Sequence, residues 1–279
     1  MRTVDGMVET REQITEQLRQ AGLSEAELAY LSERRLKNLE SGRTSVAAAV
    51  KALRKQRRRE EKARRKHGEP LASMEDVRLY CRDVREDLSD VLADESVDFI
   101  ITDPPYPHEY LPLMSDLGAL ARRVLKPGGL LIVMAGQSYL PEVMRLLSSE
   151  LDYHWTSAYL TPGGQAVQLW QRRVVTFWKP LLIFSKGRYE GDWFGDVCRS
   201  DVNNNDKRFH GWGQSVSGMA SILDKHTYPG DVILDPFVGG GATGVVCAQM
   251  GRRFIGIDND PNCIETTRRR IEEVVGCRK

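Results

Sequence analysis

A short segment that follows one apolar run has the residue types needed to activate an amine. The run from Val97 to Thr102 is followed by Asp103, Pro104, Pro105 and Tyr106. Two consecutive prolines fix the backbone and leave carbonyl acceptors without competing N–H donors. An exocyclic NH2 on adenine or cytosine is a poor nucleophile because its lone pair is delocalised into the ring. A carboxylate and a carbonyl that accept its two hydrogens would expose that lone pair. The tyrosine ring would stack on a base swung out of a duplex. We therefore expect these four residues to be catalytic.

A glycine-rich turn near the C-terminal end is typical of a nucleotide-like cofactor site. Glycines between a strand and a helix let a ligand approach the backbone and let the helix begin directly under it. The next apolar run ends in an acidic residue about 20 positions further on, where a carboxylate can bind ribose hydroxyls. The candidate cofactor-binding residues in these two segments are Asp235, Pro236, Phe237, Gly239, Gly241, Thr243, Asp258 and Asn259.

Together these segments resemble the family of DNA amino-methyltransferases, which modify adenine N6 or cytosine N4. Asp103 to Tyr106 resembles motif IV of that family, Asp231 to Gly244 its motif I and Arg253 to Asp258 its motif II. Weaker likenesses to motifs VI and VIII lie at residues 122–130 and 178–186, and the match runs over residues 76–275. The resemblance implies an α/β fold of the Rossmann-like methyltransferase type, with a mostly parallel sheet and helices on both faces. It also implies S-adenosyl-L-methionine as cofactor and double-stranded DNA as partner.

The order of the two main motifs bears on the substrate. The catalytic segment precedes the glycine turn, an order that resembles the beta group of the family and favours DNA over RNA or protein. Within the family, Asp before Pro-Pro is typical of adenine enzymes and Ser of cytosine enzymes, so we expect adenine N6, with cytosine N4 as the alternative. Residues 138–212 between the motifs are expected to recognise the target. Residues available there for bases and phosphates are Trp155, Tyr159, Trp170, Arg172, Arg173, Trp193, Asn203 to Asn205, Lys207 and Arg208.

Three positions depart from the family pattern or match it loosely. A Lys-Pro pair often precedes motif I, but Arg208 to Ser215 stands here, and Gln214 and Ser215 are the candidates for contacts with the methionine end of the cofactor. Ala242 stands where Ser or Thr is common. Asp83 matches an acidic position near the methionine part, although Asp after a strand is also a common helix cap.

Two other classes of protein share parts of this pattern. A nucleotide-binding oxidoreductase would use the same glycine turn but would leave Asp103 to Tyr106 unexplained. A non-catalytic DNA-binding protein on a methyltransferase scaffold would look almost identical, although the intact catalytic segment argues against it. A cytosine C5 methyltransferase needs a Cys nucleophile, usually after Pro, and no Pro-Cys pair occurs.

Charge is distributed unevenly along a chain whose formal net charge is only +1. Residues 51–66 are dominated by Lys and Arg, which suits either contact with phosphates or a solvated helix or linker. His67 to Pro70 marks a domain boundary, so we expect a helical, basic extension over 1–70 and a methyltransferase domain over 71–279. The scattered cysteines argue against a zinc site or a disulfide framework. No apolar run approaches membrane-spanning length and no leader pattern is visible, which favours a cytoplasmic protein without a membrane or metal partner.

The pattern of apolar runs predicts the elements that must position these residues. In the extension we expect one helix from Ser24 to about Gly42 and a second from about Thr44 into the basic block. In the larger domain, strands are expected at 77–81, 97–102, 130–134, 174–177, 181–184, 232–235 and 253–257, and helices at 113–125, 140–150, 218–225, 242–250 and 262–275.

Overall fold

The computed structural model describes residues 11–21, 28, 33–53, 55, 68–162, 167–201 and 214–276. Its contacts divide the chain into two units, residues 1–65 and residues 66–279.

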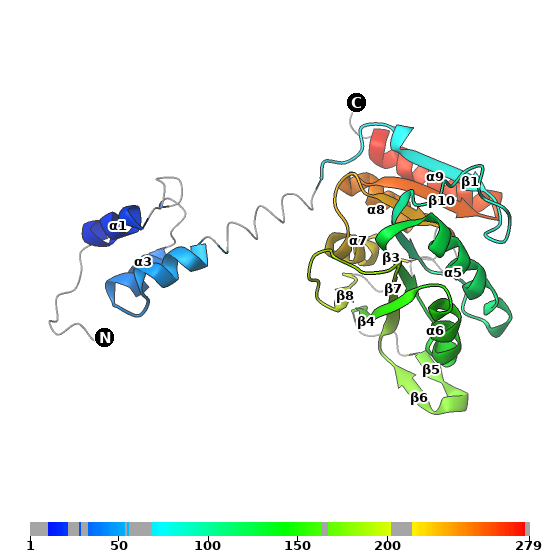
Figure 1. Cartoon of the computed structure of the whole chain (residues 1–279), viewed down its shortest axis with the longest axis horizontal. Coiled ribbons are helices and arrows are strands. Elements are labelled where there is room, and N and C mark those ends of the chain that lie inside the picture. The colour runs from blue at the N-terminus through cyan, green and yellow to red at the C-terminus, as the bar shows by residue number, and fades with distance from the viewer. Residues whose placement is uncertain are drawn as a thin grey trace. The chain divides into compact units, whose positions relative to one another are not determined.

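The N-terminal unit contains α1 (Arg11–Gln20), α3 (Glu33–Glu40) and a further helix over residues 46–53 (Figure 1). The Ser45 hydroxyl accepts the Ala48 N–H at 3.2 Å and caps that last helix. Apolar residues at helical spacing share one small core: Ile14, Leu18, Leu36, Leu39, Ala49, Val50 and Leu53. The N-terminal extension therefore has a small apolar core of its own, although most of its residues are polar. The expected cap at Ser24 and most of the basic block lie outside the described residues.

The larger unit is built on an eight-stranded sheet in the order β1-β10-β9-β2-β3-β7-β4-β8. The first five strands are parallel, β7 is antiparallel to both neighbours, and β8 runs parallel to β4. The bounds are β1 Val77–Cys81, β2 Val97–Thr102, β3 Leu125–Met134, β4 Asp152–Leu160, β7 Lys179–Ser185, β8 Val197–Arg199, β9 Val232–Asp235 and β10 Arg253–Asp258. This arrangement confirms the predicted mostly parallel sheet.

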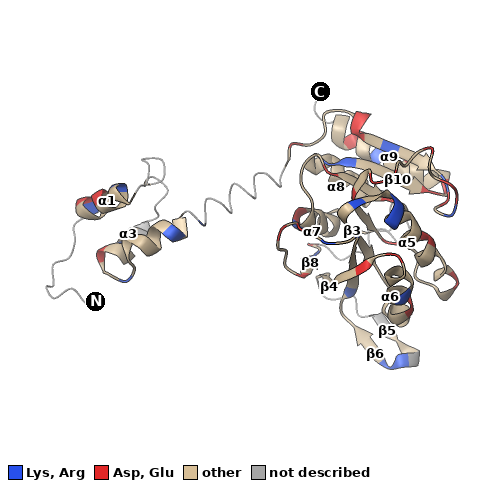
Figure 2. Cartoon of the chain, viewed as in Figure 1, with Lys and Arg blue, Asp and Glu red and all other residues tan. Residues whose placement is uncertain are grey.

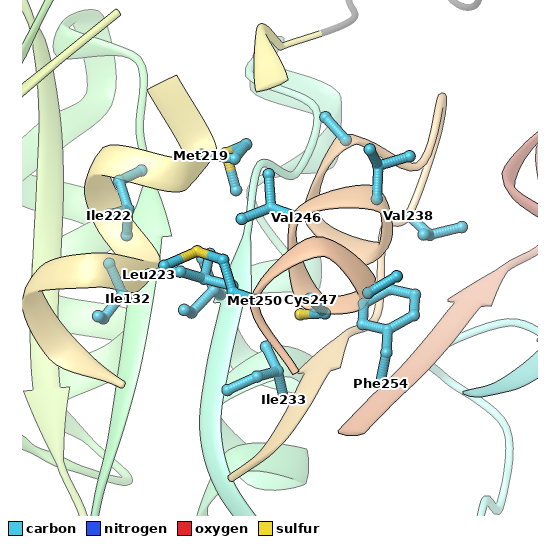
Figure 3. Close-up of a cluster of buried hydrophobic side chains, with 14 of the residues drawn as sticks. Ile132, Met219, Ile222, Leu223, Ile233, Val238, Val246, Cys247, Met250 and Phe254 are labelled. Atoms are coloured by element: carbon cyan, nitrogen blue, oxygen red, sulfur yellow. The ribbon is translucent and has the colours of Figure 1, made fainter. Parts of the chain in front are cut away.

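Helices cover both faces of the sheet because successive side chains of its strands point to opposite sides. Along β3, Ile132 packs in the cluster with α7, α8 and α9, whereas Leu131 packs in the cluster with α5 and α6. Figure 3 shows the first cluster, in which Met219 and Ile222 of α7 and Val246 of α8 are among the packed side chains. The bounds are α5 Leu113–Val124, α6 Leu140–Ser148, α7 Val216–His226, α8 Ala242–Met250 and α9 Pro261–Gly276.

The structure differs from the predicted elements mainly between β3 and β8. The strand predicted at 130–134 begins five residues earlier, at Leu125, because β3 includes Gly128 at φ 78° and a shift in its pairing to β2. The strand predicted at 174–177 is not part of the main sheet: β6 (Val174–Thr176) pairs with β5 (Val167–Leu169) in a separate hairpin. Strands β4 and β8 were not predicted, because their polar and aromatic residues give no apolar run.

Three kinds of feature are absent from the described residues: disulfides, clusters of metal ligands and helices that could span a membrane. The described cysteines, Cys81, Cys198, Cys247 and Cys263, are free thiols. Within the described ranges, no three His, Cys, Asp or Glu side chains come together as metal ligands would. No helix in the described part of the chain has the length and apolar character to cross a membrane.

Candidate active site

The carboxyl ends of neighbouring strands bring the candidate residues into one row. Asp83 follows β1, Asp258 ends β10, Asp235 ends β9 and Asp103 follows β2. Because β1, β10, β9 and β2 are adjacent and parallel, these four carboxylates lie along one edge of the sheet. Adjacent strands are about 4.8 Å apart, so segments distant in sequence become neighbours. Ligands of open α/β sheets bind at this edge.

Asp103 is held by two donors at the end of β2. The Tyr106 hydroxyl donates to one carboxylate oxygen, and the Gln214 side-chain amide donates to the other. Burial, and then the charge of Asp103, raise the pKa of the Tyr106 hydroxyl, so it stays protonated and keeps donating. An ionised carboxylate has about four lone-pair sites, so each oxygen can accept a further hydrogen bond. The Gln214 amide is a planar NH2 group, the same kind of donor as the exocyclic amine of a base.

The remaining contacts of the catalytic loop hold its aromatic ring. A Cβ on Gly136, after β3, would lie 3.2 Å from the Tyr106 Cβ, tighter than ordinary van der Waals contact, so glycine gives this ring its room. The Lys179 ammonium lies 5.8 Å from the ring centroid. Pro104 is buried and Pro105 is exposed. A small hollow beside the loop is lined by apolar and aromatic residues, among them Pro104, Pro105, Tyr106, Tyr110, Met134 and Tyr139.

Asp235 connects the catalytic loop to the glycine turn. One of its carboxylate oxygens accepts the Thr102 hydroxyl at 2.7 Å and the Phe237 N–H at 3.2 Å, and the other accepts the Thr243 hydroxyl at 2.7 Å. The side chain is only 3% exposed, and burial raises its pKa to about 6. The structure therefore places Asp235 behind the cofactor turn, where it positions both loops, and not on the surface that a cofactor would touch.

The glycine turn before α8 has a backbone that other residues cannot copy. Gly239 and Gly241 have φ values of 48° and 78°, and a side chain on Gly241 would come within 2.5 Å of the Thr267 hydroxyl on α9. The carbonyl of Gly240 accepts from Arg270, also on α9. Pro236 is buried, and Phe237 is half-buried. The turn thus packs on α9 while the first turn of α8 begins directly behind it, an arrangement suited to a ligand near its backbone N–H groups.

Two acidic residues and an amide complete the row at the edge of the sheet. Asp258 accepts the Gly239 N–H at 2.8 Å and the Asp260 N–H at 3.0 Å, so it shapes the glycine turn from the next strand. Asn259 lies 3.5 Å from the Asp83 carboxylate. The Arg85 guanidinium, 2.6 Å away, holds the pKa of Asp83 well below its usual range. Asp83 is therefore ionised beside Asp258 at neutral pH.

Ser215 and Gln214 were both candidates for contacts with the cofactor, but their side chains lie in different surroundings. The Ser215 hydroxyl accepts the Gly218 N–H at 3.0 Å and caps α7, and it lies 2.7 Å from the Ser200 hydroxyl. It is buried, with the Tyr159 hydroxyl 3.4 Å away. Ser215 thus serves the start of α7, while Gln214 faces the catalytic carboxylate.

Comparisons with known proteins agree with this geometry. Residues 185–269 match the family model N6_N4_Mtase, described as DNA methylase. The type II methyltransferase M.HpaI of Haemophilus parainfluenzae is 25% identical over 239 residues, which are 71% of this chain and 74% of that protein. Both matches are to DNA methyltransferases, and they agree with the resemblance to the DNA amino-methyltransferase family that the sequence motifs carry.

Solved structures show the same fold in other DNA methyltransferases. The structure of the M1.HpyAVI complex with SAM has a TM-score of 0.58 and 22% identity, covering 70% of this chain and 98% of that one. The PvuII DNA methyltransferase, titled cytosine-N4-specific, has a TM-score of 0.57 and 16% identity, covering 75% of this chain and 94% of that one. These likenesses show the Rossmann-like α/β fold of the amino-methyltransferase family.

The structure describes only some of the residues that are expected to recognise the target. Tyr159 is buried, which corrects its assignment as a residue available to DNA, whereas Trp170 and Trp193 are exposed. Trp155 is half exposed and donates to Asp196 at 3.3 Å. Asn203 to Asn205, Lys207 and Arg208 lie outside the described residues.

Four contributors to the site were missed by sequence reasoning. Thr102 and Lys179 are the last and first residues of strands that meet at the site, and Gly136 follows a third such strand. Their positions at strand ends were the available signal. Arg85 gave none, because its role depends on the local turn that brings it onto Asp83.

Proposed function

We propose that this chain is an S-adenosylmethionine-dependent DNA methyltransferase that methylates N6 of adenine in a base extruded from double-stranded DNA. The observation that carries the proposal is the Asp103 carboxylate, which receives the planar NH2 group of Gln214 next to the glycine turn. An adenine amine in the place of that amide would donate to the same oxygen. The similarity to DNA methyltransferases supports DNA as the substrate class.

The residues present fit the proposed cofactor. Gly239 and Gly241 let a ligand lie against the backbone at the start of α8, and Phe237 offers a half-buried apolar face. Asp258 retains acceptor capacity for ribose hydroxyls, since each of its oxygens accepts one N–H. Asp83, ionised beside Asn259, suits the ammonium group of the methionine part. When bound, S-adenosyl-L-methionine supplies an electrophilic methyl group; M1.HpyAVI is described in complex with SAM.

The chain's own residues would prepare the amine for transfer. The Asp103 carboxylate and the Pro104 carbonyl accept the two amine hydrogens, which pulls the nitrogen towards a tetrahedral form and exposes its lone pair. Tyr106 orients the carboxylate through its hydroxyl and presents its ring to the extruded base. When the new N–CH3 bond forms, the bond between the methyl group and the cofactor sulfur would break with its electron pair left on sulfur. The amine nitrogen would then lose one proton, for which Asp103 is the nearest acceptor.

An aspartate substitution tests this assignment. Asp103→Ala should abolish transfer of tritiated methyl groups to DNA while leaving cofactor affinity, measured by calorimetry, within about tenfold, because the glycine turn is untouched. Asp103→Asn keeps the shape and removes the charge, so it should also be inactive. Turnover near that of the wild type in either variant would overturn the catalytic assignment.

Product analysis separates adenine N6 from cytosine N4. DNA methylated by the wild-type protein should yield N6-methyladenine after digestion to nucleosides and mass spectrometry. N4-methylcytosine as the product would overturn the choice of base and leave the amine mechanism in place. Cofactor binding with no transfer to any DNA would favour a non-catalytic DNA-binding protein.

A further inference from the structure

A small β-hairpin leaves the main sheet between β4 and β7. Strands β5 and β6 pair only with each other in the described part of the chain, and the tip between them is Trp170 to Arg173. Figure 1 shows the hairpin standing away from the main sheet, beyond β4 and α6. An isolated two-stranded hairpin is at best marginally stable in water. Because the hairpin gains little stability from its own pairing, its exposed side chains are candidates for a binding role.

The hairpin exposes large apolar side chains to water. Trp170 at the tip is 81% exposed, and Phe177, just after β6, is 57% exposed. Val174, Val175 and Trp178 are also exposed. Several large exposed apolar side chains in one short segment are unusual in a soluble protein, and such segments often mark an interaction site. The aromatic content favours a partner that offers flat, stackable surfaces.

Contacts at its base and tip place the hairpin next to the catalytic loop. The Arg172 guanidinium donates to the Ser138 carbonyl at 2.7 Å, two residues after the Gly136 that makes room for Tyr106. Lys179, at the foot of the hairpin, lies over the Tyr106 ring. The hairpin is therefore anchored on both sides of the loop that would receive an extruded base.

The charge of this region suits a polyanion. The sequence from Tyr153 to Tyr189 contains no Asp or Glu, although the chain has 39 acidic residues in all. Arg172 and Arg173 flank the exposed tryptophan, and Figure 2 shows basic colour and no acidic colour on the hairpin. A protein partner could cover the apolar side chains, but the complete loss of acidic residues favours phosphates as neighbours.

We propose that the tip of this hairpin enters the DNA duplex and that Trp170 inserts into the base stack beside the target base. This inference rests on the function proposed above. Extruding a base costs stacking energy, and a flat ring that fills the gap offsets part of it. Arg172 and Arg173 would contact the adjoining phosphates and hold the tip in place.

The experiment compares paired with pre-opened DNA. The sequence methylated by the wild-type protein is first mapped, and single-turnover methylation is then measured on that duplex and on a duplex with an abasic site opposite the target. Trp170→Ala should be slower by about tenfold or more on the paired duplex, the scale of one lost base–aromatic stack. On the abasic duplex, where little stacking is lost on extrusion, it should approach the wild-type rate.

Two further variants make the comparison specific. Trp170→Phe keeps a stackable ring and should recover most of the rate on paired DNA. Tyr153→Ala removes an aromatic ring that is 45% exposed at the start of β4, the opposite end of that strand from the hairpin, and it should behave as the wild type on both duplexes. With 2-aminopurine as the target base, the fluorescence increase on binding should be lost in Trp170→Ala alone.

Several results would overturn the insertion. Equal rates for Trp170→Ala and the wild type on paired DNA, or an equal loss on both duplexes, would each contradict it. A change in oligomeric state with unchanged methylation would instead assign the hairpin to contacts between copies of the chain. Absence of methylation by the wild-type protein would overturn the proposed function and this inference together, whereas a failure confined to the variants leaves the function intact.

Discussion

Asp235 is a carboxylate whose burial should make folding stability depend on pH. Its pKa lies near 6, above the ordinary 3.8, because burial penalises the charged form more than the donors of Thr102, Thr243 and Phe237 stabilise it. Between about pH 4 and 6 the folded chain keeps a proton that the unfolded chain has released, and so the free energy of unfolding falls as pH rises through this range. The penalty is fully present above pH 6.

Asp235→Asn should remove this dependence. An amide cannot ionise, and the threonine hydroxyls can turn to accept from it. Relative to the variant, the wild type should lose about 3 kcal/mol between pH 4 and pH 7, since one pKa unit corresponds to about 1.4 kcal/mol. Urea unfolding of both proteins at several pH values measures the difference. Asp231, whose pKa is also raised to about 6, is common to both proteins and cancels. Parallel curves would contradict the prediction.

At this scale, the sequence predicted which residues gather but not how each is used. The alternation of strands and helices puts every carboxylate at the same edge, so Asp83, Asp103 and Asp258 were found without the structure. Whether a carboxylate faces a ligand or the interior depends on a few ångströms of packing. Asp235 and Ser215 were therefore assigned to the cofactor, although their side chains are bonded within the protein.

Helices α7 and α8 end against one buried guanidinium. Arg252, with no measurable exposure, donates to the Thr227 hydroxyl and carbonyl at 3.1 and 3.0 Å and to the Met250 carbonyl. Carbonyls at the ends of helices carry partial negative charge, which a cation complements. Burial lowers the pKa of this guanidinium without making it neutral at physiological pH.

Arg252→Met should destabilise the larger unit by about 2–4 kcal/mol, because it leaves several buried acceptors without a donor. The neighbouring variant Arg253→Met is the matched control. Arg253 forms an ion pair with Asp76 at 3.2 Å in which both side chains are about half exposed, and such a pair contributes only about 0–1 kcal/mol. Urea unfolding of the full chain compares the two. Similar losses in both variants would show that the buried network contributes little.

Strands that coincide with a continuous apolar run were predicted at the right place in the chain, whereas strands without such a run were missed or misplaced. β2 and β9 begin and end as predicted, because parallel strands in the middle of a sheet need continuous apolar residues. β1 also matches its predicted bounds, although it is an edge strand whose side chains are partly exposed. β4 lies near the edge of the sheet and exposes Tyr153 and Trp155 on one side, so its sequence lacks that signal. Strand β6 of the β5–β6 hairpin does not bury one face, so its sequence shows no regular alternation of apolar and polar residues.

For the whole chain, the basic residues of segment 51–66 suggest a second contact with DNA. If they neutralise phosphates, removing residues 1–66 should weaken binding by a similar factor at every sequence. The salt dependence should also flatten, since the logarithm of affinity falls with the logarithm of salt by about 0.9 for each phosphate neutralised. Gly68 and Leu71 should stay, because both pack on the end of α8.

Binding isotherms for the full and shortened chains at several salt concentrations test this prediction. Sequence preference should survive the truncation, because base contacts are assigned elsewhere. A solvated linker predicts equal affinities and equal slopes, and that result would remove the segment from the DNA interface.

The antiparallel direction of β7 makes the connection between β4 and β7 a part of the chain whose sequence and length can vary easily. β4 ends and β7 begins at the same edge of the sheet, so residues 161–178 leave and return at neighbouring points. This connection can become longer or shorter, or be replaced, without changing the order of the strands or the packing of either apolar cluster. The segment proposed to meet the duplex can therefore vary almost separately from the residues proposed to do the chemistry, and a changed target preference need not alter the reaction.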